Sequence, residues 1–491
     1  MRTLFLNPPS FEGFDGGAGS RWPSTREIAS YWYPVWLCYP AGMLEDSKVL
    51  DAVPHGVSIE QTVAMAKDFE LLVLFTSSPG FHVDVKIAEM MKDSNSKLQV
   101  AFVGPPVTIE PEKTLNASKA IDFIVRREFD NQIAAYAKGT PLSELPGVSY
   151  RKNGSNMHNP EAGYIEDLDS LPWVSKVYKR DLDFKRYNVP FLLHPYISLY
   201  TARGCPAQCT FCLWPQTHSG HRWRLRSTTD VVNECRYILE NFSGLKEIFF
   251  DDDTFNYRKA RTIEVCEELK KLDFAKRGVT WSCTSRVTTD YDTLKAMREA
   301  GCRLMIVGYE SGDQQILKNM KKGATIAMAE RFTANAKKLG LTIHGDFIIG
   351  MPGESRETIR KTIDFAKRMD VDTIQVSIAH AYPGTEFYQY AQEKGLVTID
   401  MADTEGHQLP NVVYPGILDR AEMVDWVERF YGEYYFRPRA AWRIVRKAMF
   451  DAGDRKRLYG EAKSYLKLRA KRKKYVADHK AGVLNQAEER V

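Results

Sequence analysis

Three cysteines lie close together in the chain: Cys205, Cys209 and Cys212, in the segment TARGCPAQCTFCLW. Cysteine thiolates bind metal ions and iron–sulfur clusters. A structural zinc ion takes four protein ligands, and a ferredoxin-type cluster takes four cysteines. Three cysteines can surround one 4Fe–4S cubane and leave one iron open to a small molecule. The spacing therefore favours a catalytic cluster with one coordination position that the protein does not fill.

A zinc site is the alternative interpretation, because His218 or His221 could supply a fourth ligand in CPAQCTFCLWPQTHSGH. The chain has eight cysteines, and the other five are scattered through apolar or helical stretches. We expect those five to be small core residues in a reducing compartment: Cys38, Cys235, Cys266, Cys283 and Cys302.

The cysteines follow the first of six strand patterns that alternate with helical patterns over residues 196–395. The strand patterns are YISLYTARG, KEIFFDDD, VTWSCTSR, RLMIVGYES, LTIHGDFIIG and DTIQVSIAH. Such a series predicts a partial (β/α)6 parallel barrel, in which functional side chains gather where strands end. Polar or glycine-rich clusters do follow the strands: Asp251 to Asp253, Arg286, Glu310 with Ser311, and the segment around Ile348.

RGCPAQCTFC resembles the Cys-x3-Cys-x2-Cys signature of the radical S-adenosylmethionine (SAM) superfamily, and the later strand ends agree with that resemblance. It implies that Cys205, Cys209 and Cys212 hold a 4Fe–4S cluster whose open iron binds the methionine part of SAM. One electron from the cluster would then cleave SAM to a 5′-deoxyadenosyl radical. Phe211, directly before the third cysteine, can pack against the cluster or a flat ring.

The resemblance also implies contacts to SAM at the strand ends. Asp252, or one of its two acidic neighbours, would meet the methionine amino group, and Arg286 would pair with the methionine carboxylate. Glu310 and Ser311 would contact the ribose and methionine ends, and Ile348 would line the adenine. Each has an alternative without SAM. The acidic residues could cap a helix, and Arg286 could form a surface salt bridge. Glu310 could belong to a buried ion pair, and the glycines near Ile348 could only form a turn.

Residues 1–145 carry strand patterns at TLFLN, ELLVLFTS, LQVAFVG and AIDFIVR with helical patterns between them, which predicts a doubly wound parallel sheet. Residues 146–195 read as a hairpin, with Asn153-Gly154 as its turn, followed by a linker. An N-terminal domain of this kind, with LNPP and VGPPVT, resembles the cobalamin-binding subgroup of radical SAM proteins. The Asp-x-His-x-x-Gly element is absent, so cobalamin would bind without that histidine; a domain that has lost the cofactor is the alternative.

Within that subgroup, LNPPSFEGFDGGAGSRWPSTRE, YWYPVW, FFDDDTFNY and SIAHAYPGTEFY resemble the radical SAM proteins associated with hopanoid biosynthesis. This implies a hopanoid lipid substrate and ring contraction of the glucosamine of glucosaminyl bacteriohopanetetrol to a cyclitol ether. A one-electron donor such as a flavodoxin or ferredoxin would be needed. The alternatives are a cobalamin-dependent radical SAM methyltransferase on a lipid or other small molecule, and a zinc-stabilised membrane- or RNA-binding protein.

The basic charge of the chain belongs to its last part. Residues 411–491 hold 19 Lys and Arg against 11 Asp and Glu, a net charge of +8, whereas the 410 residues before them carry −3. We expect residues 396–491 to be helical, and their mixture of aromatic and basic residues suits a membrane surface or a cap on the barrel. No RNA-binding module is readable, so no nucleic-acid partner is expected.

No secretory signal and no apolar run of about 18 residues is present, so we expect a cytoplasmic protein, with a peripheral position on the inner membrane face as a further expectation.

Overall fold

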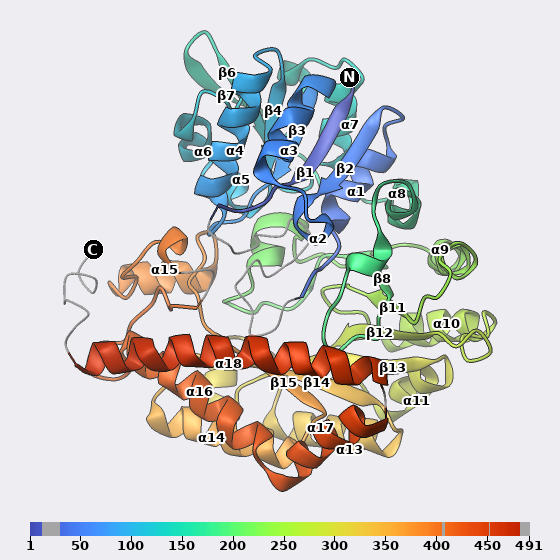
Figure 1. Ribbon diagram of the computed structural model, residues 1–491, viewed down its shortest axis with the longest axis vertical. Helices are drawn as coiled ribbons and strands as arrows, with labels where there is room; N and C mark the ends of the chain where they lie inside the picture. Colours follow the sequence, from blue (N-terminus) through green and yellow to red (C-terminus); the bar gives the residue numbers. More distant parts are fainter. Residues whose placement is uncertain (12–29, 405–407, 451, 482–491) are drawn as a thin grey trace.

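The computed structural model describes residues 1–11, 30–404, 408–450 and 452–481 (Figure 1). Two sheets form its frame, with an N-terminal α/β unit at one end and a strand-helix barrel at the other. The predicted doubly wound sheet, partial barrel and helical C-terminal region are all confirmed. Among the described residues, no helix has both the length and the apolar character that crossing a bilayer requires.

The N-terminal sheet has the strand order β2-β1-β3-β4-β5-β6-β7, and its first five strands are parallel. Side chains on both faces of β1 are buried: Phe5 packs into the larger core, whereas Leu4 and Leu6 pack against α3 and α4. Burial on both faces explains the near-continuous apolar strands. The strands are β1 Thr3–Asn7, β2 Ser47–Asp51, β3 Leu71–Phe75, β4 Gln99–Val103, β5 Phe123–Val125, β6 Val148–Lys152 and β7 Ser155–His158.

The hairpin predicted after residue 146 is present as β6 and β7, and it joins the N-terminal sheet by pairing with β5. Its turn residues Asn153 and Gly154 have φ angles of 52° and 81°, which is the backbone that an Asn-Gly hairpin turn requires. The helices of this half are α1 Val35–Gly42, α2 Ala52–His55, α3 Ile59–Ala64, α4 Phe81–Ser94, α5 Pro105–Ile109, α6 Pro111–Ala117, α7 Asp130–Ala137 and α8 Val174–Asp181.

The barrel sheet has six parallel strands in the order β15-β14-β13-β12-β11-β8, so its two edge strands are the last and the first. Its strands are β8 Tyr196–Leu199, β11 Glu247–Phe250, β12 Thr280–Ser285, β13 Cys302–Glu310, β14 Thr342–Ile349 and β15 Thr373–Ile378. Its helices are α9 Thr228–Asn241, α10 Lys259–Lys270, α11 Tyr291–Glu299, α12 Gln314–Asn319, α13 Ile326–Lys338, α14 Arg356–Met369 and α15 Glu386–Glu393.

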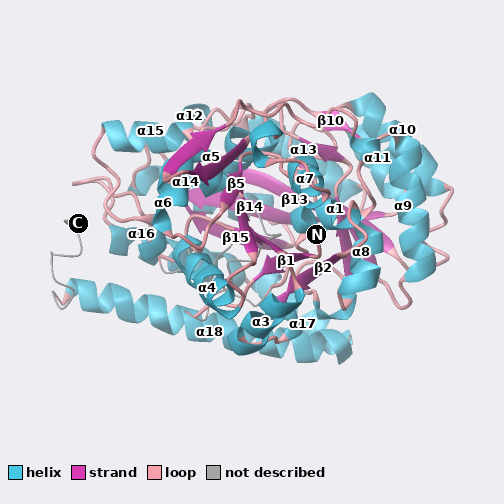
Figure 2. Cartoon of the chain, turned by 90° about the horizontal axis from the view of Figure 1, so that it is seen from above, coloured by secondary structure: helices cyan, strands magenta, loops and turns pink. Residues whose placement is uncertain are grey.

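Three helices complete the chain: α16 Arg420–Tyr435, α17 Pro438–Phe450 and α18 Ala452–Lys480. Helix α16 covers the barrel edge at β15, where the Val376 and Ile374 N–H groups donate to the hydroxyls of Tyr431 and Tyr435 at 3.0 and 2.9 Å. These bonds satisfy donors that an open edge would expose. Helix α18 packs on α16 and α17 and runs along the outside of the molecule (Figure 2).

The carboxyl ends of the N-terminal strands face the barrel. Phe75, the last residue of β3, lies 6.3 Å from Trp214 between ring centroids, and Phe129, after β5, lies 5.9 Å from His218. In an open parallel sheet the ligand crevice lies beyond this edge. The ligand-binding edge of one domain is therefore turned toward the cysteine segment of the other.

Candidate active site

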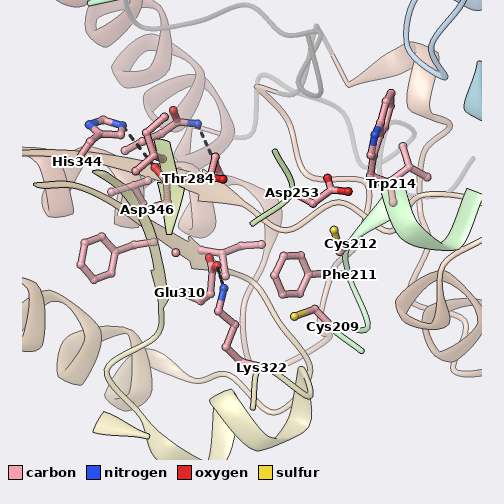
Figure 3. Close-up of a pocket in the computed structure, with 18 of the residues that line it drawn as sticks. Cys209, Phe211, Cys212, Trp214, Asp253, Thr284, Glu310, Lys322, His344 and Asp346 are labelled. Carbon is pink, nitrogen blue, oxygen red and sulfur yellow. Dashed lines mark hydrogen bonds and ion pairs between the residues drawn. The ribbon is translucent and has the colours of Figure 1, made fainter. Parts of the chain in front are cut away.

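A cavity of about 290 Å³ lies inside the barrel and extends to the cysteine segment (Figure 3). Seven of the nine residues predicted as site residues line it: four belong to the cysteine segment, and three lie on or directly after the neighbouring strands β12, β13 and β14. They are Cys205, Cys209, Phe211, Cys212, Arg286, Glu310 and Ile348.

The cysteine segment begins after β8 and is held by a short antiparallel pair, β9 Ala202–Arg203 with β10 Arg224–Leu225. Gly204 follows at φ 88°, and a Cβ there would collide with the Arg222 carbonyl oxygen. Only glycine accommodates both restrictions. The chain thus turns at once into the cavity wall that carries the cysteines.

Of the three acidic residues predicted to meet the methionine amino group, Asp252 does not line the cavity. Its side chain is fully buried, and it accepts hydrogen bonds from the Thr201 N–H at 2.6 Å and the Ala202 N–H at 3.2 Å. Asp251 and Asp253 line the cavity instead. Extended residues point alternately to opposite sides, so Asp252 faces the cysteine segment while its two neighbours face the cavity. Asp252 therefore positions the cysteine segment.

Ser311 is likewise absent from the cavity wall. It is buried, and its hydroxyl lies 3.1 Å from the Thr362 hydroxyl and accepts from the Asp313 N–H at 3.1 Å. These contacts fix the turn that leads from β13 into α12. The SAM contact of Ser311 stays a prediction, and in this structure its hydroxyl is engaged within the turn.

Cys205 and Cys209 are buried, and Cys212 is partly buried. Burial, with a smaller contribution from the negative charge of Asp253, raises the pKa of Cys205 to about 11. Burial and the two neighbouring cysteines raise the pKa of Cys212 well above its usual value. Binding of iron would hold these sulfurs as thiolates and release their protons.

The two histidines that could complete a zinc site with the three cysteines make other contacts. Among the described residues, no three His, Cys, Asp or Glu side chains are arranged to hold a single metal ion. A cubane keeps its cysteine sulfurs farther apart than one zinc ion does, since each sulfur binds a different iron. His218 packs against Trp36 and Trp214, and His221 Nδ1 lies 3.1 and 3.0 Å from the carbonyl oxygens of Cys205 and Ala207. Neither histidine is placed as the fourth ligand.

Glu310 and Lys322 form a buried ion pair on the cavity wall, with Oε1 and Nζ 2.5 Å apart. Glu310 has a φ of 64°, an unusual value outside glycine, and a side chain at Gly308 would collide with its carboxylate. Burial lowers the pKa of Lys322, but the charges of Glu310 and Cys209 outweigh this and leave the pKa raised. Arg286 donates to the Lys322 carbonyl. This part of the wall therefore combines the Glu310 carboxylate with the cations Lys322 and Arg286. A carboxylate suits ribose hydroxyls, and cations suit the carboxylate of an amino acid.

Lys322 is a cavity residue outside the predicted set, since it lies in a turn after α12 and not at a strand end. The far end of the cavity also holds residues outside that set: His344 and Asp346 share the strand face of Ile348 at intervals of two residues. His344 Nδ1 lies 2.7 Å from the Thr373 hydroxyl, and its ring stacks on Phe191 at 4.0 Å. In the segment HGDFI, every second residue points to the same side of the strand, and this pattern could have identified His344 and Asp346 as neighbours of Ile348.

The N-terminal domain is tied to the cysteine segment by buried ion pairs. Arg203 donates through both terminal nitrogens to Asp130 at 2.8 and 2.9 Å, and Arg224 pairs with Glu128 at 2.6 Å. Trp214 lies between this interface and the cavity, and its buried Nε1 has no hydrogen-bond partner within the described part of the chain. The carboxyl edge of the N-terminal sheet, where such a sheet binds its ligand, therefore lies beside the cysteine segment.

Comparison with known proteins shows two family matches. Residues 199–366 match the model of the radical SAM superfamily, and residues 22–137 match the model of the B12 binding domain. The first implies a 4Fe–4S cluster and SAM, and the second implies cobalamin, so the three cofactor predictions are confirmed.

Relatives and solved structures agree with these matches. An uncharacterized methyltransferase of Pyrococcus horikoshii is 32% identical over 81% of this chain and 84% of its own length. The anaerobic magnesium-protoporphyrin IX monomethyl ester cyclase of Rubrivivax gelatinosus is 26% identical over 97% of this chain and 84% of its own length.

The radical SAM methyltransferase TsrM of Kitasatospora setae, solved with cobalamin and a 4Fe–4S cluster, has the same fold with a TM-score of 0.67 and 15% identity. The match covers 95% of this chain and 99% of that structure.

Proposed function

The chain belongs to the radical SAM proteins that carry an N-terminal B12-binding domain, and on this premise we propose that it is a cobalamin-dependent radical SAM methyltransferase acting on a small molecule. One observation carries the proposal: the cysteine segment lies between the barrel cavity and the carboxyl edge of the B12-binding sheet. A substrate in the cavity, SAM at the cysteines and cobalamin at the sheet edge would all meet at this segment. Relatives named as methyltransferases support the assignment.

When bound, the cluster supplies the electron that cleaves SAM and cobalamin supplies the methyl group. The protein supplies the binding site. Cys205, Cys209 and Cys212 would hold the cluster, and Gly204 and Asp252 keep their segment at the cavity wall. Glu310 would bind the ribose hydroxyls, and Arg286 would bind the methionine carboxylate. Ile348 and Phe211 would pack against the flat rings.

The far end of the cavity would hold the substrate. Trp32, Phe191 and Phe249 form an aromatic floor there, with ring centroids 6.3 Å and 5.7 Å from Trp32 to the other two. Asp346 and Ser377 place acceptors on the wall above it. Such a site can hold an apolar ring system by packing and orient its polar groups by hydrogen bonds. The buried floor would also keep water away from a reactive radical.

A second candidate is the radical ring contraction of the glucosamine of glucosaminyl bacteriohopanetetrol. It rests on the resemblance of several segments to hopanoid-associated proteins. Cyclase relatives that align with nearly the whole chain support a reaction on a carbon skeleton. The methyltransferase relatives favour methyl transfer over this candidate.

Mass spectrometry after anaerobic turnover separates the two reactions. The reconstituted enzyme, with cobalamin and a flavodoxin or ferredoxin as reductant, is given SAM with a deuterated methyl group and a hopanoid extract. Methyl transfer places the label in a product and yields two nucleoside products. One is S-adenosylhomocysteine, from the SAM that gives up its methyl group, and the other is 5′-deoxyadenosine, from the SAM that is cleaved; S-adenosylhomocysteine is therefore the product that ring contraction lacks. Ring contraction gives an unlabelled new carbocycle and 5′-deoxyadenosine. If neither labelled product nor SAM cleavage occurs in protein that holds its cluster, the proposed function is wrong.

A further inference from the structure

Helix α18 presents two different faces. Its inner face packs on the barrel through Leu468, Arg472 and Val476, which are buried, and Arg472 pairs with Glu428 of α16 at 3.1 Å. Its outer face carries exposed lysines: Lys463, Lys467 and Lys474 follow one another at spacings of four and seven residues and so lie on one side of the helix, and Lys473 adjoins Lys474. We call these the lysine face: Lys463, Lys467, Lys473 and Lys474.

The charge of this helix is strongly one-sided. From Tyr459 to Lys480 the chain has eight Lys and Arg against two acidic residues, a net charge of +6. The inner arginines Arg469 and Arg472 pair with Glu428, at 3.4 and 3.1 Å. Because Glu428 pairs with these arginines, it does not neutralise the lysines, and the lysine face carries a positive charge at the surface.

Large hydrophobic side chains accompany the lysines. Among the described residues, the four most exposed large hydrophobic side chains all belong to the C-terminal region: Tyr459 at 75%, Phe436 at 68%, Trp442 at 60% and Leu466 at 58%. Tyr459 and Leu466 lie on the same side of α18 as the lysines, since seven residues separate them and Lys463 lies between. Phe436 adjoins α18, where Arg469 lies 5.7 Å from its ring centroid.

The same helix borders the barrel cavity. Arg472 lines the cavity together with Gln408, and its Nε donates to the Gln408 Oε1 at 3.2 Å. The inner face of α18 thus contributes Arg472 to the cavity wall, whereas the four lysines are exposed. The helix itself runs along the outside of the molecule (Figures 1 and 2). A surface that binds α18 would lie one helix thickness from the cavity.

We propose that the lysine face, with Tyr459 and Leu466, docks the protein on an anionic lipid bilayer, with α18 parallel to the membrane plane. Lysines near the headgroups are attracted to anionic lipids, and exposed aromatic and aliphatic side chains enter the headgroup boundary. A bilayer matches both kinds of side chain, whereas a nucleic acid would leave Leu466 in water. The proposal does not depend on which reaction the cavity carries out.

Co-sedimentation of the full chain with vesicles tests the proposal. We expect binding to vesicles of phosphatidylcholine mixed with phosphatidylglycerol, weak binding to phosphatidylcholine alone, and a decrease in binding as salt increases. The variant Lys463→Gln/Lys467→Gln/Lys473→Gln/Lys474→Gln should lower the partition coefficient by about tenfold or more. Its SAM cleavage without vesicles should stay unchanged, which shows that it folds.

The matched control removes the same charge elsewhere: Lys259→Gln/Lys271→Gln/Lys276→Gln/Lys295→Gln, all exposed and on or near α10 and α11. We expect wild-type binding from it. Equal partitioning of the two quadruple variants would overturn the proposal, as would equal binding to both vesicle types. Preferential binding of single-stranded RNA in competition with the vesicles would also overturn it.

Discussion

Arg203 and Asp130 form a two-bond ion pair across the boundary between the domains, with both side chains only 1% exposed. Arg203 also lies over the rings of Trp36 and Tyr39, 4.8 and 4.5 Å from their centroids. Cys205 follows two residues later. The B12-binding domain therefore helps to fix the place where the cysteine segment begins.

Removing Asp130 should test this coupling. The variant Asp130→Ala leaves the Arg203 charge buried without its main partner, so we expect a loss of about 3–5 kcal/mol in the free energy of unfolding. Urea unfolding measures it, and the iron content after reconstitution should fall as well. The double variant Asp130→Ala/Arg203→Met removes both charges and should recover much of the loss. Additive losses in the double variant would contradict the coupling.

The cysteines of the segment should differ in function from those of the core. Cys209→Ala removes one of the three sulfurs, so we expect 5′-deoxyadenosine formation to fall below detection. Cys235→Ala changes a buried cysteine of α9 and serves as the control, with cluster content and SAM cleavage near wild type. Both are measured by iron analysis and chromatography of turnover mixtures. Wild-type SAM cleavage by Cys209→Ala would refute the cluster assignment.

Glu310 should contribute to SAM affinity. Glu310→Gln removes the charge of the carboxylate, and hydrogen bonds to charged groups contribute about 1.5–3 kcal/mol, so we expect SAM to bind roughly tenfold to a hundredfold more weakly. Titration calorimetry on the reconstituted enzyme measures this. The variant Glu310→Gln/Lys322→Met restores charge balance and separates folding from affinity, and Glu357→Gln on the exposed face of α14 is the control. An unchanged SAM affinity in Glu310→Gln would exclude the role.

Glu354 should make stability depend on pH. Burial raises its pKa from 4.5 to about 8, although the N–H groups of Gly350 and Met351 donate to it. Between pH 4.5 and about 8, the carboxyl group of the native state therefore keeps its proton, whereas the same group in the unfolded state has lost it. Stability from this group is therefore present at low pH and decreases as pH rises through that range, by up to about 1.4 kcal/mol per pH unit.

Glu354→Gln should remove that contribution because an amide has the shape of the protonated acid and does not titrate. Urea unfolding at several pH values gives the difference between wild type and variant. We expect the advantage of the wild type to shrink as pH rises. A difference that is constant across this range would contradict the raised pKa.

The sequence was sufficient for the local features. The cysteine spacing, the strand ends at Arg286 and Glu310, and the Asn153-Gly154 turn all depend on neighbouring residues, and the structure places them as predicted. The sequence does not say which of the three acidic residues after β11 faces the cavity, because that depends on how the chain leaves the strand. The structure assigns the cavity side to Asp251 and Asp253.

The remaining site residues depend on contacts between distant segments. Trp32 precedes α1 and Phe191 lies in the linker before β8, yet both reach the floor of the barrel. Lys322 reaches the site because Glu310 folds back toward it. No local pattern specifies such contacts, since they follow from how the two domains and their linker pack.

Electron paramagnetic resonance of anaerobically reconstituted, reduced protein tests the central claim most directly. The three-cysteine site should give the signal of one reduced 4Fe–4S cluster, and the signal should change when SAM is added, because SAM would bind the iron that no cysteine holds. Absence of a 4Fe–4S signal, or a signal that SAM leaves unchanged, would contradict the account.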